Sequence, residues 1–281
     1  MPTHAAVDSA PWSSRQLIDV LGATACRFDV VDLTVCDSTN AELMRRIEAR
    51  PELPSGTVIV AERQTAGRGR RGRDWQSSQQ RPEHSLTFSL LWRFPRASDL
   101  SGLSLAVGVA VAEAISELAP GQSLAKLRLK WPNDILLALS DGLAKAGGIL
   151  IELQATKTAM NAVIGIGLNL HTPEATITDQ RVAGLDAALG EVRARENVLA
   201  EVLRHLAPVL DVFALQGFSP LQARWQEKNA FAGRQVRLLD EQGEVASGEC
   251  LGVDADGALR VGTLNGPLRW LVGDVSLRHA E

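Results

Sequence analysis

A loop rich in arginine and glycine holds the residues of this sequence that are best suited to binding an anion. It runs from Ala66 to Arg73 and contains four arginines and three glycines. Bidentate guanidinium donors and bare backbone N–H groups suit phosphate or carboxylate. On its own, such a run is more typical of a solvated basic turn or a nucleic-acid patch. Here Glu62 and Gln64 end an apolar strand before the loop and Trp75 closes it, so both ends are anchored and a ligand site is favoured.

The loop is not a P-loop, because no lysine and hydroxyl residue follow its glycines at the start of a helix. Three further motifs place functional groups near strand ends: KWPND at 130–134, KAGG at 145–148 and GIGLN at 165–169. They supply an indole, amides, a carboxylate, a lysine and glycines that let a ligand approach the backbone. Each also has a plainer interpretation, such as a core tryptophan, an ordinary turn pair or a solvated lysine. Only their combination therefore carries weight.

Hydrophobic periodicity predicts the elements that must position these motifs. The run Asp37-Ser38-Thr39-Asn40 offers several N-cap candidates, and Thr39 and Glu42 stand at capping-box spacing. Pro51 and Pro54 stop the helix that follows. Short alternating runs between turn residues after Gly233 predict a small β-barrel. The predicted strands are 28–36, 57–62, 85–92, 126–131, 135–139, 147–155 and 161–170. The predicted helices are one that begins near 39, two that span 98–118 and 195–216, and a shorter one that contains Trp225.

Length and composition bound the organisation of the chain. Its 281 residues suffice for one large domain and one small one, and we place an N-terminal extension at 1–27, the large domain at 28–230 and the small domain at 231–281. With 45% hydrophobic and 22% charged residues, the composition is that of a soluble globular protein, and no apolar run has the length of a membrane span. The formal charge of −4 provides no global attraction for nucleic acid or anionic lipid.

The three cysteines, Cys26, Cys36 and Cys250, lack C-x-x-C spacing and are expected to be reduced residues of the core or of strands. The N-terminus shows no basic segment followed by an apolar core and a cleavage site, so we see no pattern of a secretory signal. We therefore expect a cytoplasmic protein. The roughly 35 residues before the first motif are fewer than an independent helix-turn-helix domain needs.

The motifs DSTN, Q-x-AGRGRRGR-x-W, KWPND, K-x-GGIL-x-E and GIGLN, in this order, resemble those of the biotin protein ligase family, also called biotin acetyl-CoA-carboxylase ligase. The resemblance spans Asp37 to Asn169, and residues 273–278 are similar to the end of the family's C-terminal domain. It implies an α+β fold of the class II synthetase type, with a mixed, mainly antiparallel sheet and helices, and a small C-terminal SH3-like β-barrel. It also implies a ligase that uses ATP and Mg²⁺ to form biotinyl-5'-AMP and transfers biotin to a lysine of a biotin carboxyl carrier protein.

The resemblance further implies roles for individual residues. The expected catalytic residues are Arg70, Lys145 and Asp134, with Asp134 orienting or deprotonating the acceptor lysine, and no residue is assigned as a metal ligand. The residues implied to hold biotin and its adenylate are Ser38, Thr39, Asn40, Gln64, Arg68, Gly69, Arg70 and Lys145. The residues implied to line the ATP side are Arg71, Arg73, Trp75, Trp131, Asn133, Asp134, Asn169 and Arg278, and Trp75 is also implied to wall the biotin pocket.

Two segments depart from the family pattern. The stretch QSSQQRPEHSLTFS after Trp75, at the expected rim of the pocket, differs from the shorter, glycine-bearing approach of many members. Residues 171–190 match no motif and are expected to form a surface loop with part of a helix. The alternatives are a lipoate-type ligase, a biotin-responsive DNA-binding repressor and a pure biotin-binding module. We expect no nucleic-acid or membrane partner, and a monomer or weak homodimer.

Overall fold

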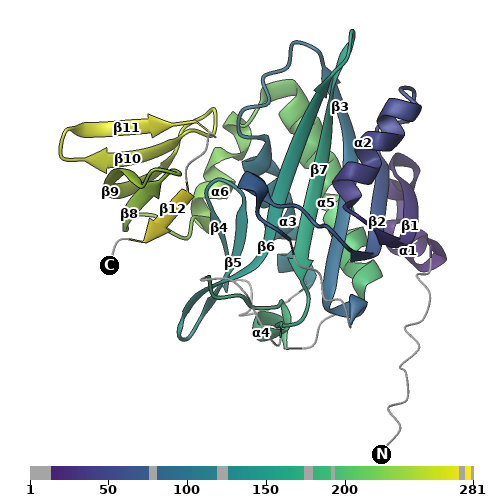
Figure 1. The fold of residues 1–281 in the computed structure, drawn as a ribbon, viewed down its shortest axis with the longest axis horizontal. Helices are drawn as coiled ribbons and strands as arrows, with labels where there is room; N and C mark the ends of the chain where they lie inside the picture. Colours follow the sequence, from purple (N-terminus) through teal and green to yellow (C-terminus); the bar gives the residue numbers. More distant parts are fainter. Residues whose placement is uncertain are drawn as a thin grey trace, which may run out of the picture.

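The computed structural model describes residues 14–75, 81–118, 126–173, 180–190, 194–271 and 276–279. Its larger part is built on a seven-stranded mixed sheet, and a smaller five-stranded antiparallel sheet lies beside it (Figure 1). This architecture confirms the expected α+β fold with a small C-terminal β unit.

The large sheet brings the strands that carry the motifs next to one another. Across the sheet the order is β1 (Asp29–Cys36), β2 (Thr57–Gln64), β3 (Ser85–Pro95), β7 (Ala159–Asn169), β6 (Gly142–Ala155), β5 (Asp134–Leu139) and β4 (Leu127–Lys130). β1 and β2 are parallel, whereas the other adjacent pairs are antiparallel. Short connections join β4 to β5, β5 to β6 and β6 to β7, which confirms the predicted meander.

Helices cover the sheet because successive residues of a strand point to opposite faces, and apolar side chains on both faces need a cover. The helices are α1 (Ser14–Leu21), α2 (Thr39–Ala49), α3 (Leu103–Leu118), α4 (Asp186–Leu189), α5 (Arg195–Gln216) and α6 (Gln222–Lys228), with 3-10 turns at Gly22–Arg27, Arg70–Gly72, Pro82–His84 and Ser219–Leu221. α3 and α5 bury one face of the sheet, including Phe88 and Ile164. α2 lies on the other face (Figure 1), where Leu43 and Ile47 pack against Leu91.

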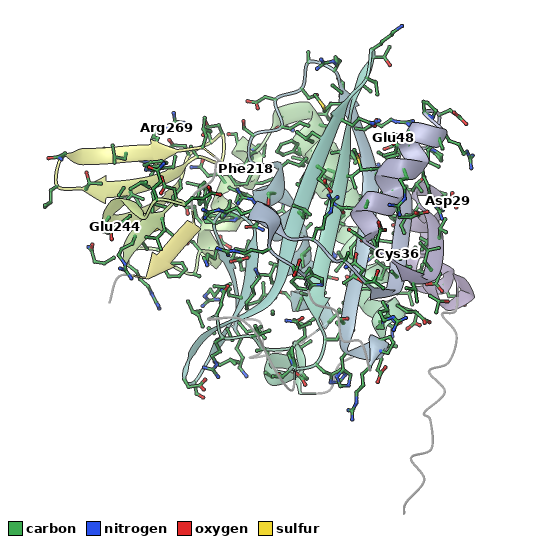
Figure 2. The ribbon with its side chains drawn as sticks, in the orientation of Figure 1. Asp29, Cys36, Glu48, Phe218, Glu244 and Arg269 are labelled. Atoms are coloured by element: carbon green, nitrogen blue, oxygen red, sulfur yellow. The ribbon has the colours of Figure 1, made fainter. Side chains whose placement is uncertain are left out.

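The helix predicted to begin near residue 98 begins at Leu103. Gly102, immediately before it, has φ 78°, which is outside the helical region and is easily adopted only by glycine. A β-carbon built on Gly102 would lie 2.8 Å from the side chain of Phe218, which lies between the two units (Figure 2). The close approach of the chain at this point explains the late start of α3.

The predicted start of one strand near the motifs is wrong, and of the N-cap candidates for α2 the structure selects Ser38 without a capping box at Thr39. β6 begins at Gly142, five residues before the predicted start, so Lys145 lies within a strand. The N-cap of α2 is Ser38, whose carbonyl accepts a hydrogen bond from the N–H of Glu42 at 2.9 Å, and Thr39 is the first helical residue. The hydroxyl of Thr39 is therefore available for contacts outside the helix.

The C-terminal unit is a five-stranded antiparallel sheet that shares a core with the larger unit. The strand order is β11 (Gly266–Trp270), β10 (Leu259–Thr263), β9 (Glu244–Val253), β8 (Gln235–Leu239) and β12 (Ser276–His279). Buried residues such as Val236 and Leu259 join the same apolar cluster as Trp225 of α6. The indole of Trp131 donates a hydrogen bond to the carbonyl of Gly257 at 3.2 Å, which ties the end of β4 to the smaller sheet.

The cysteines are free thiols, as expected, but only two fit the predicted setting. Cys36 lies half-buried in β1 and Cys250 is buried in β9, whereas Cys26 is exposed in a 3-10 turn. Burial raises the pKa of the Cys36 thiol to about 11, so this group stays protonated at neutral pH. Within the described residues, no helix combines the length and the apolar character that crossing a membrane requires.

Candidate functional site

One face of the sheet carries small and polar side chains where β3, β7, β6 and β5 meet. Thr87 pairs with Gly167, Gly167 with Gly148, and Gly148 with Asp134. Residues paired directly across strands point to the same face, so these four residues form one row. The two glycines leave the backbone bare in the middle of the row. We call Gly148, Gly165 and Gly167 the glycine floor, because a flat ligand could lie against the sheet there.

A buried polar corner stands at one side of the glycine floor. Thr39 donates to Gln64 Oε1 through its N–H at 2.7 Å and through its hydroxyl at 3.1 Å. The hydroxyl of Ser89 lies 2.5 Å from Asn40 Oδ1 and 2.7 Å from Thr39 Oγ1. All four side chains are nearly inaccessible to solvent. β2 continues two residues beyond its predicted end, which is why Gln64 reaches this corner.

Asn40 is held directly over the glycine floor. A β-carbon built on Gly165 would lie only 2.2 Å from Asn40 Oδ1, so no larger residue fits at this position without moving the amide. The neighbouring Ser38 is 3% exposed. The structure therefore brings together the predicted residues Ser38, Thr39, Asn40 and Gln64 as donors and acceptors suited to a small polar ring.

The arginine-glycine loop folds as a small hairpin. The N–H of Gly69 donates to the carbonyl of Arg73 at 2.7 Å, and the N–H of Trp75 donates to the carbonyl of Gly67 at 2.8 Å. Arg71 adopts φ 61° and ψ 37°, a left-handed conformation that is uncommon for a residue with a side chain. The hairpin borders a groove of about 560 Å³. The groove is lined by Ala66, Arg68, Gly69, Arg70, Arg71, Gly72, Arg73, Asp74, Ser104, Pro132, Ile149, Leu150, Ile151 and Glu152.

Two lysines share one carboxylate at the end of the row. Lys145 Nζ lies 2.5 Å from Asp134 Oδ1, and Lys130 Nζ lies 3.2 Å from Asp134 Oδ2. Burial by itself would raise the pKa of Asp134, but the two ammonium groups outweigh it and hold the pKa below its ordinary value. Asp134 is therefore an ionised group that holds two cations in place, and it is a weak proton acceptor.

Trp75, which closes the loop, lies on the glycine floor. A β-carbon built on Gly167 would lie 2.4 Å from the Trp75 ring, and one built on Gly148 would lie 3.7 Å from Lys145 Nζ and 3.8 Å from the Trp75 ring. The indole Nε1 is buried, and among the described residues it has no hydrogen-bond partner. A buried donor without a partner costs about 1–3 kcal/mol, so this nitrogen favours a ligand that can accept its hydrogen.

Two predicted amides border the same region. Asn133 donates to the carbonyl of Ile149 at 2.8 Å and accepts from Arg70 Nη1 at 3.5 Å. Asn169 is 6% exposed and donates to the carbonyl of Ala183 at 3.4 Å. Each amide is thus held by backbone at one end, which fixes its orientation.

The segment predicted as a surface loop at 171–190 is partly buried, and this prediction is wrong for residues 183–185. The N–H of Lys145 donates to the carbonyl of Arg181 at 2.8 Å, and the N–H of Ala183 donates to the carbonyl of Lys145 at 2.9 Å. Ala183 and Leu185 are 2% and 0% exposed. The segment therefore adds backbone alongside the site lysine, while the predicted helical part is α4. Residues 174–179, and residues 76–80 of the pocket rim, lie outside the described residues.

Of the predicted ATP-side residues, Arg71 and Arg73 line the groove, whereas Trp131 faces away from it. Trp131 is 0% exposed, and its indole faces Gly257 of the C-terminal unit, so it serves as core at the junction of the two units. The backbone of Arg278 lies in β12, but its side chain is outside the described residues.

Three contributors were missed by the sequence analysis: Lys130, Ser89 and Glu152. Glu152 accepts hydrogen bonds from Asn40 and Arg68, and the other two make the contacts given above. Two signals for Glu152 were available: it ends the K-x-GGIL-x-E motif, and it lies four residues after Gly148 and therefore on the same face of the sheet.

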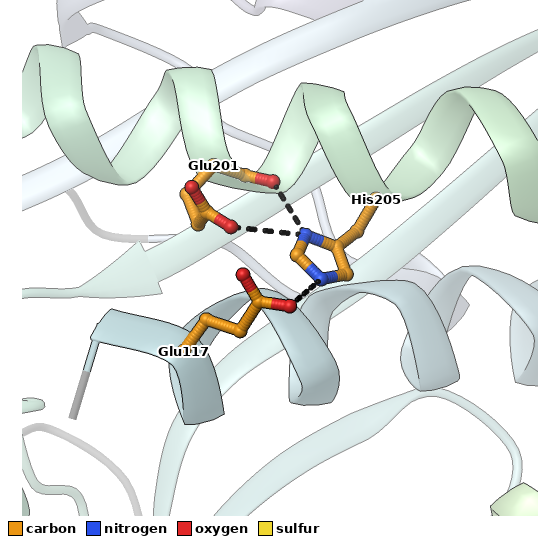
Figure 3. A group of neighbouring side chains, drawn as sticks. All are labelled: Glu117, Glu201 and His205. Atoms are coloured by element: carbon orange, nitrogen blue, oxygen red, sulfur yellow. Dashed lines mark hydrogen bonds and ion pairs between the residues drawn. The ribbon is translucent and has the colours of Figure 1, made fainter. Parts of the chain in front are cut away.

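Another cluster of potential metal ligands lies between α3 and α5, on the helix-covered side of the sheet (Figure 3). His205 lies 3.2 Å from Glu117 and 3.3 Å from Glu201. Arg204 forms ion pairs with both carboxylates, so their negative charge is already balanced by a guanidinium group. We interpret the cluster as an ion-paired contact between two helices.

The motifs and the C-terminal unit both match known proteins. Residues 33–169 match the Biotin/lipoate A/B protein ligase family, and residues 231–278 match the Biotin protein ligase C terminal domain. The Bifunctional ligase/repressor BirA of Escherichia coli is 37% identical over 257 residues, which cover 90% of this chain and 75% of that protein. The biotin acetyl-CoA-carboxylase ligase of Paracoccus denitrificans is 33% identical over 239 residues, which cover 82% of this chain and 92% of that protein.

A solved structure shows the same fold. The biotin protein ligase from Aquifex aeolicus in complex with biotin and ATP aligns with a TM-score of 0.72 at 30% identity, covering 90% of this chain and 99% of that one. These matches confirm the resemblance of the motifs, and the chain therefore belongs to the biotin protein ligase family and is a ligase.

Proposed function

We propose that this protein activates biotin with ATP and transfers it, through biotinyl-5'-AMP, to a lysine of a biotin carboxyl carrier protein. The observation that carries the proposal is the glycine floor, bordered by the polar corner at Asn40, by Lys145 and by the indole of Trp75. A polar ring, a carboxylate chain and a phosphate could be recognised in succession along these groups. The Aquifex aeolicus structure, which holds biotin and ATP on the same fold, supports this assignment.

In the first half-reaction, a carboxylate oxygen of biotin attacks the α-phosphorus of ATP and pyrophosphate leaves. Negative charge increases on the transferring group, and fixed cations stabilise it. Lys145 is positioned for this role, because its ammonium is held by Asp134 at the edge of the glycine floor. Arg70, Arg71 and Arg73 on the hairpin would add charge from the opposite side.

The magnesium ion is expected to enter as part of the MgATP substrate. Asp134 is ion-paired with two lysines, and Glu152 is ion-paired with Arg68. Neither carboxylate therefore fits the role of a dedicated metal ligand. Phosphate oxygens of the nucleotide suit Mg²⁺ as its main ligands.

In the second half-reaction, the acceptor lysine nitrogen attacks the acyl carbon of biotinyl-5'-AMP, AMP leaves with the bonding electrons, and the lysine gives up a proton. The depressed pKa of Asp134 argues against its taking that proton and favours a role in orienting the cations. The loop hairpin would protect the mixed anhydride from water until the acceptor arrives.

The C-terminal unit also borders the reaction region. A cavity of about 300 Å³ lies at the junction of the two units and is lined by Lys130, Leu136, Leu143, Gln180, Phe231, Arg234 and Leu277. Lys130 thus touches both this cavity and the Asp134 ion pair. This arrangement supports participation of the C-terminal unit in receiving ATP or the acceptor domain.

The test is intact-mass analysis of a biotin carboxyl carrier domain after incubation with the protein, biotin and MgATP. One biotinyl adduct is the expected result, and Arg70→Ala is expected to release free adenylate or to lose activity. Lipoate added in competition distinguishes the two acyl chains covered by the matched family. Adducts formed from lipoate but not from biotin, or from neither, would overturn the proposal.

A DNA-binding role is a separate question, because the Escherichia coli relative is named a ligase and repressor. We continue to predict that this chain does not bind DNA specifically. A gel shift that persists at physiological salt and distinguishes DNA sequences would contradict that prediction.

A further inference from the structure

We propose that Glu152 is a positioning residue that couples the arginine-glycine loop to the biotin pocket. Its carboxylate joins two motifs that are far apart in the sequence, Asn40 at the start of α2 and Arg68 in the loop. The inference rests on the proposed function for its effect on biotin, but its effect on the loop can be measured with no substrate present.

The contacts of Glu152 are charge-assisted and close. Asn40 Nδ2 donates to Glu152 Oε2 at 2.8 Å, and Arg68 Nη2 lies 2.9 Å and 3.0 Å from the two carboxylate oxygens. Glu152 is only 30% exposed in its side chain, which limits screening by solvent. Hydrogen bonds to ionised groups are stronger than those between neutral groups.

The sheet explains why a side chain at this position can reach both partners. Glu152 shares a face with Gly148, and β5 pairs with β6 only as far as Gly148. Beyond that point β6 pairs with β7 alone, so the side of the strand toward the loop is left open. The groove lined by Arg68 and Glu152 lies along this open stretch.

Glu152 also sets the direction of the Asn40 amide. A carboxylate accepts hydrogen bonds and does not donate them, so it orients Nδ2 toward itself. Oδ1 then faces Ser89, whose hydroxyl lies at 2.5 Å. Without the carboxylate, Nδ2 would keep only its longer hydrogen bond to the carbonyl of Leu150, at 3.3 Å, so the amide would be held less firmly.

The resulting network connects both ends of the recognition region. It runs from Gln64 through Thr39, Ser89 and Asn40 to Glu152 and then to Arg68. The loop carries four arginines and one aspartate between Ala66 and Trp75, so its positive charges repel one another. Glu152 supplies a negative charge from outside the loop and holds it near the pocket. The loop and the amide that would meet biotin are therefore oriented by one group.

The first experiment is limited proteolysis by trypsin of the full chain with no substrate, comparing wild type with Glu152→Gln. We expect cleavage after Arg71 to be about tenfold faster in the variant, because the loop has lost its anchor. Glu244→Gln, at an exposed glutamate of the C-terminal unit, is the matched control and is expected to cleave at the wild-type rate. Equal cleavage rates for wild type and Glu152→Gln would overturn the proposal.

The second experiment separates positioning from general loss of structure. Glu152→Gln is expected to raise the KM for biotin about tenfold, while the KM for ATP changes less than twofold. Glu152→Asp keeps the charge but has a shorter side chain, so its KM for biotin is expected to lie between those of wild type and Glu152→Gln. An equal rise in both KM values, or a fall in kcat alone, would contradict the coupling.

Arg68→Gln provides the third measurement, and this single variant remains informative if Glu152→Gln folds poorly, while the two variants together form a double-mutant cycle. Arg68→Gln alone is expected to accelerate cleavage after Arg71, and the double variant is expected to accelerate it no further. Additive effects would show that the two residues act separately and would refute the proposal that the Glu152–Arg68 contact holds the loop. If wild type forms no biotinyl-5'-AMP, the proposed function fails, whereas the proteolysis result still decides the role of Glu152 in the loop.

Discussion

Lys145 and Asp134 form a close ion pair across two adjacent strands, with Nζ 2.5 Å from Oδ1, and the second oxygen of Asp134 is taken by Lys130. One carboxylate therefore fixes two cations at the edge of the glycine floor. A single lysine on a flexible stem would be a mobile point charge, whereas this pair holds the ammonium where the proposed mechanism needs a cation near the phosphate.

Asp134→Asn is expected to slow biotinyl-5'-AMP formation by at least about tenfold, because Lys145 loses the group that holds it. Transfer from preformed biotinyl-5'-AMP is expected to keep the pH dependence of wild type, since the depressed pKa of Asp134 makes it a weak base. Single-turnover measurements of the two half-reactions check this. If transfer lost its rise with pH in Asp134→Asn, Asp134 would be the base instead.

The same ion pairs make a prediction about stability and pH. The folded pKa of Asp134 lies below its unfolded value of about 3.9, so its stabilising contribution is present above that pH and is lost as pH falls through the folded pKa. Asp134→Asn is expected to lower the free energy of unfolding by about 3 kcal/mol at neutral pH. Urea unfolding should show this difference constant from about pH 8 to pH 5 and shrinking below about pH 4. A difference that grew on acidification would contradict the assignment.

Two alanine substitutions in the glycine floor are expected to have different effects. Gly165→Ala would place a methyl group 2.2 Å from Asn40 Oδ1 and force the amide to move. We therefore expect the Kd for biotin to rise by about tenfold or more. Gly167→Ala collides with the Trp75 ring at 2.4 Å, so it should slow adenylate formation through displacement of the loop end. Isothermal titration with biotin and a pyrophosphate-release assay measure the two effects.

Gly262→Ala is the control for these variants. The atoms nearest to its β-carbon would be those of the Leu251 side chain, at 3.4 Å and beyond, within the C-terminal unit. We expect wild-type biotin affinity and adenylate formation. Equal losses in all three variants would indicate general destabilisation of the sheets and would remove support for a ligand on the glycine floor.

Trp131→Phe tests whether this tryptophan contacts ATP or stabilises the junction of the two units. The buried indole donates one hydrogen bond to Gly257, so its loss is expected to cost about 1 kcal/mol in the free energy of unfolding. The KM for ATP is expected to stay within twofold of wild type. A large rise in that KM without loss of stability would restore Trp131 to the ATP side.

The sequence by itself determined most of the elements and most of the candidate site residues. α5 spans Arg195–Gln216, as its apolar repeat predicts, and the alternating runs of the meander became β4 to β7. These features are local, because the period of apolar residues is set by the geometry of one helix or one strand. The clustering of arginines and glycines at 66–73 was likewise visible without any structure.

Only the tertiary structure decided which of these residues meet. Trp131 and Asn133 belong to the same motif, yet one faces the C-terminal unit and the other faces Arg70. Glu152 became important because β6 extends past its pairing with β5, and residues 181–185 became part of the site because they lie along Lys145. The pairing register of distant strands and the packing of the two units fix such contacts, and neither leaves a periodic signal within one segment of the chain.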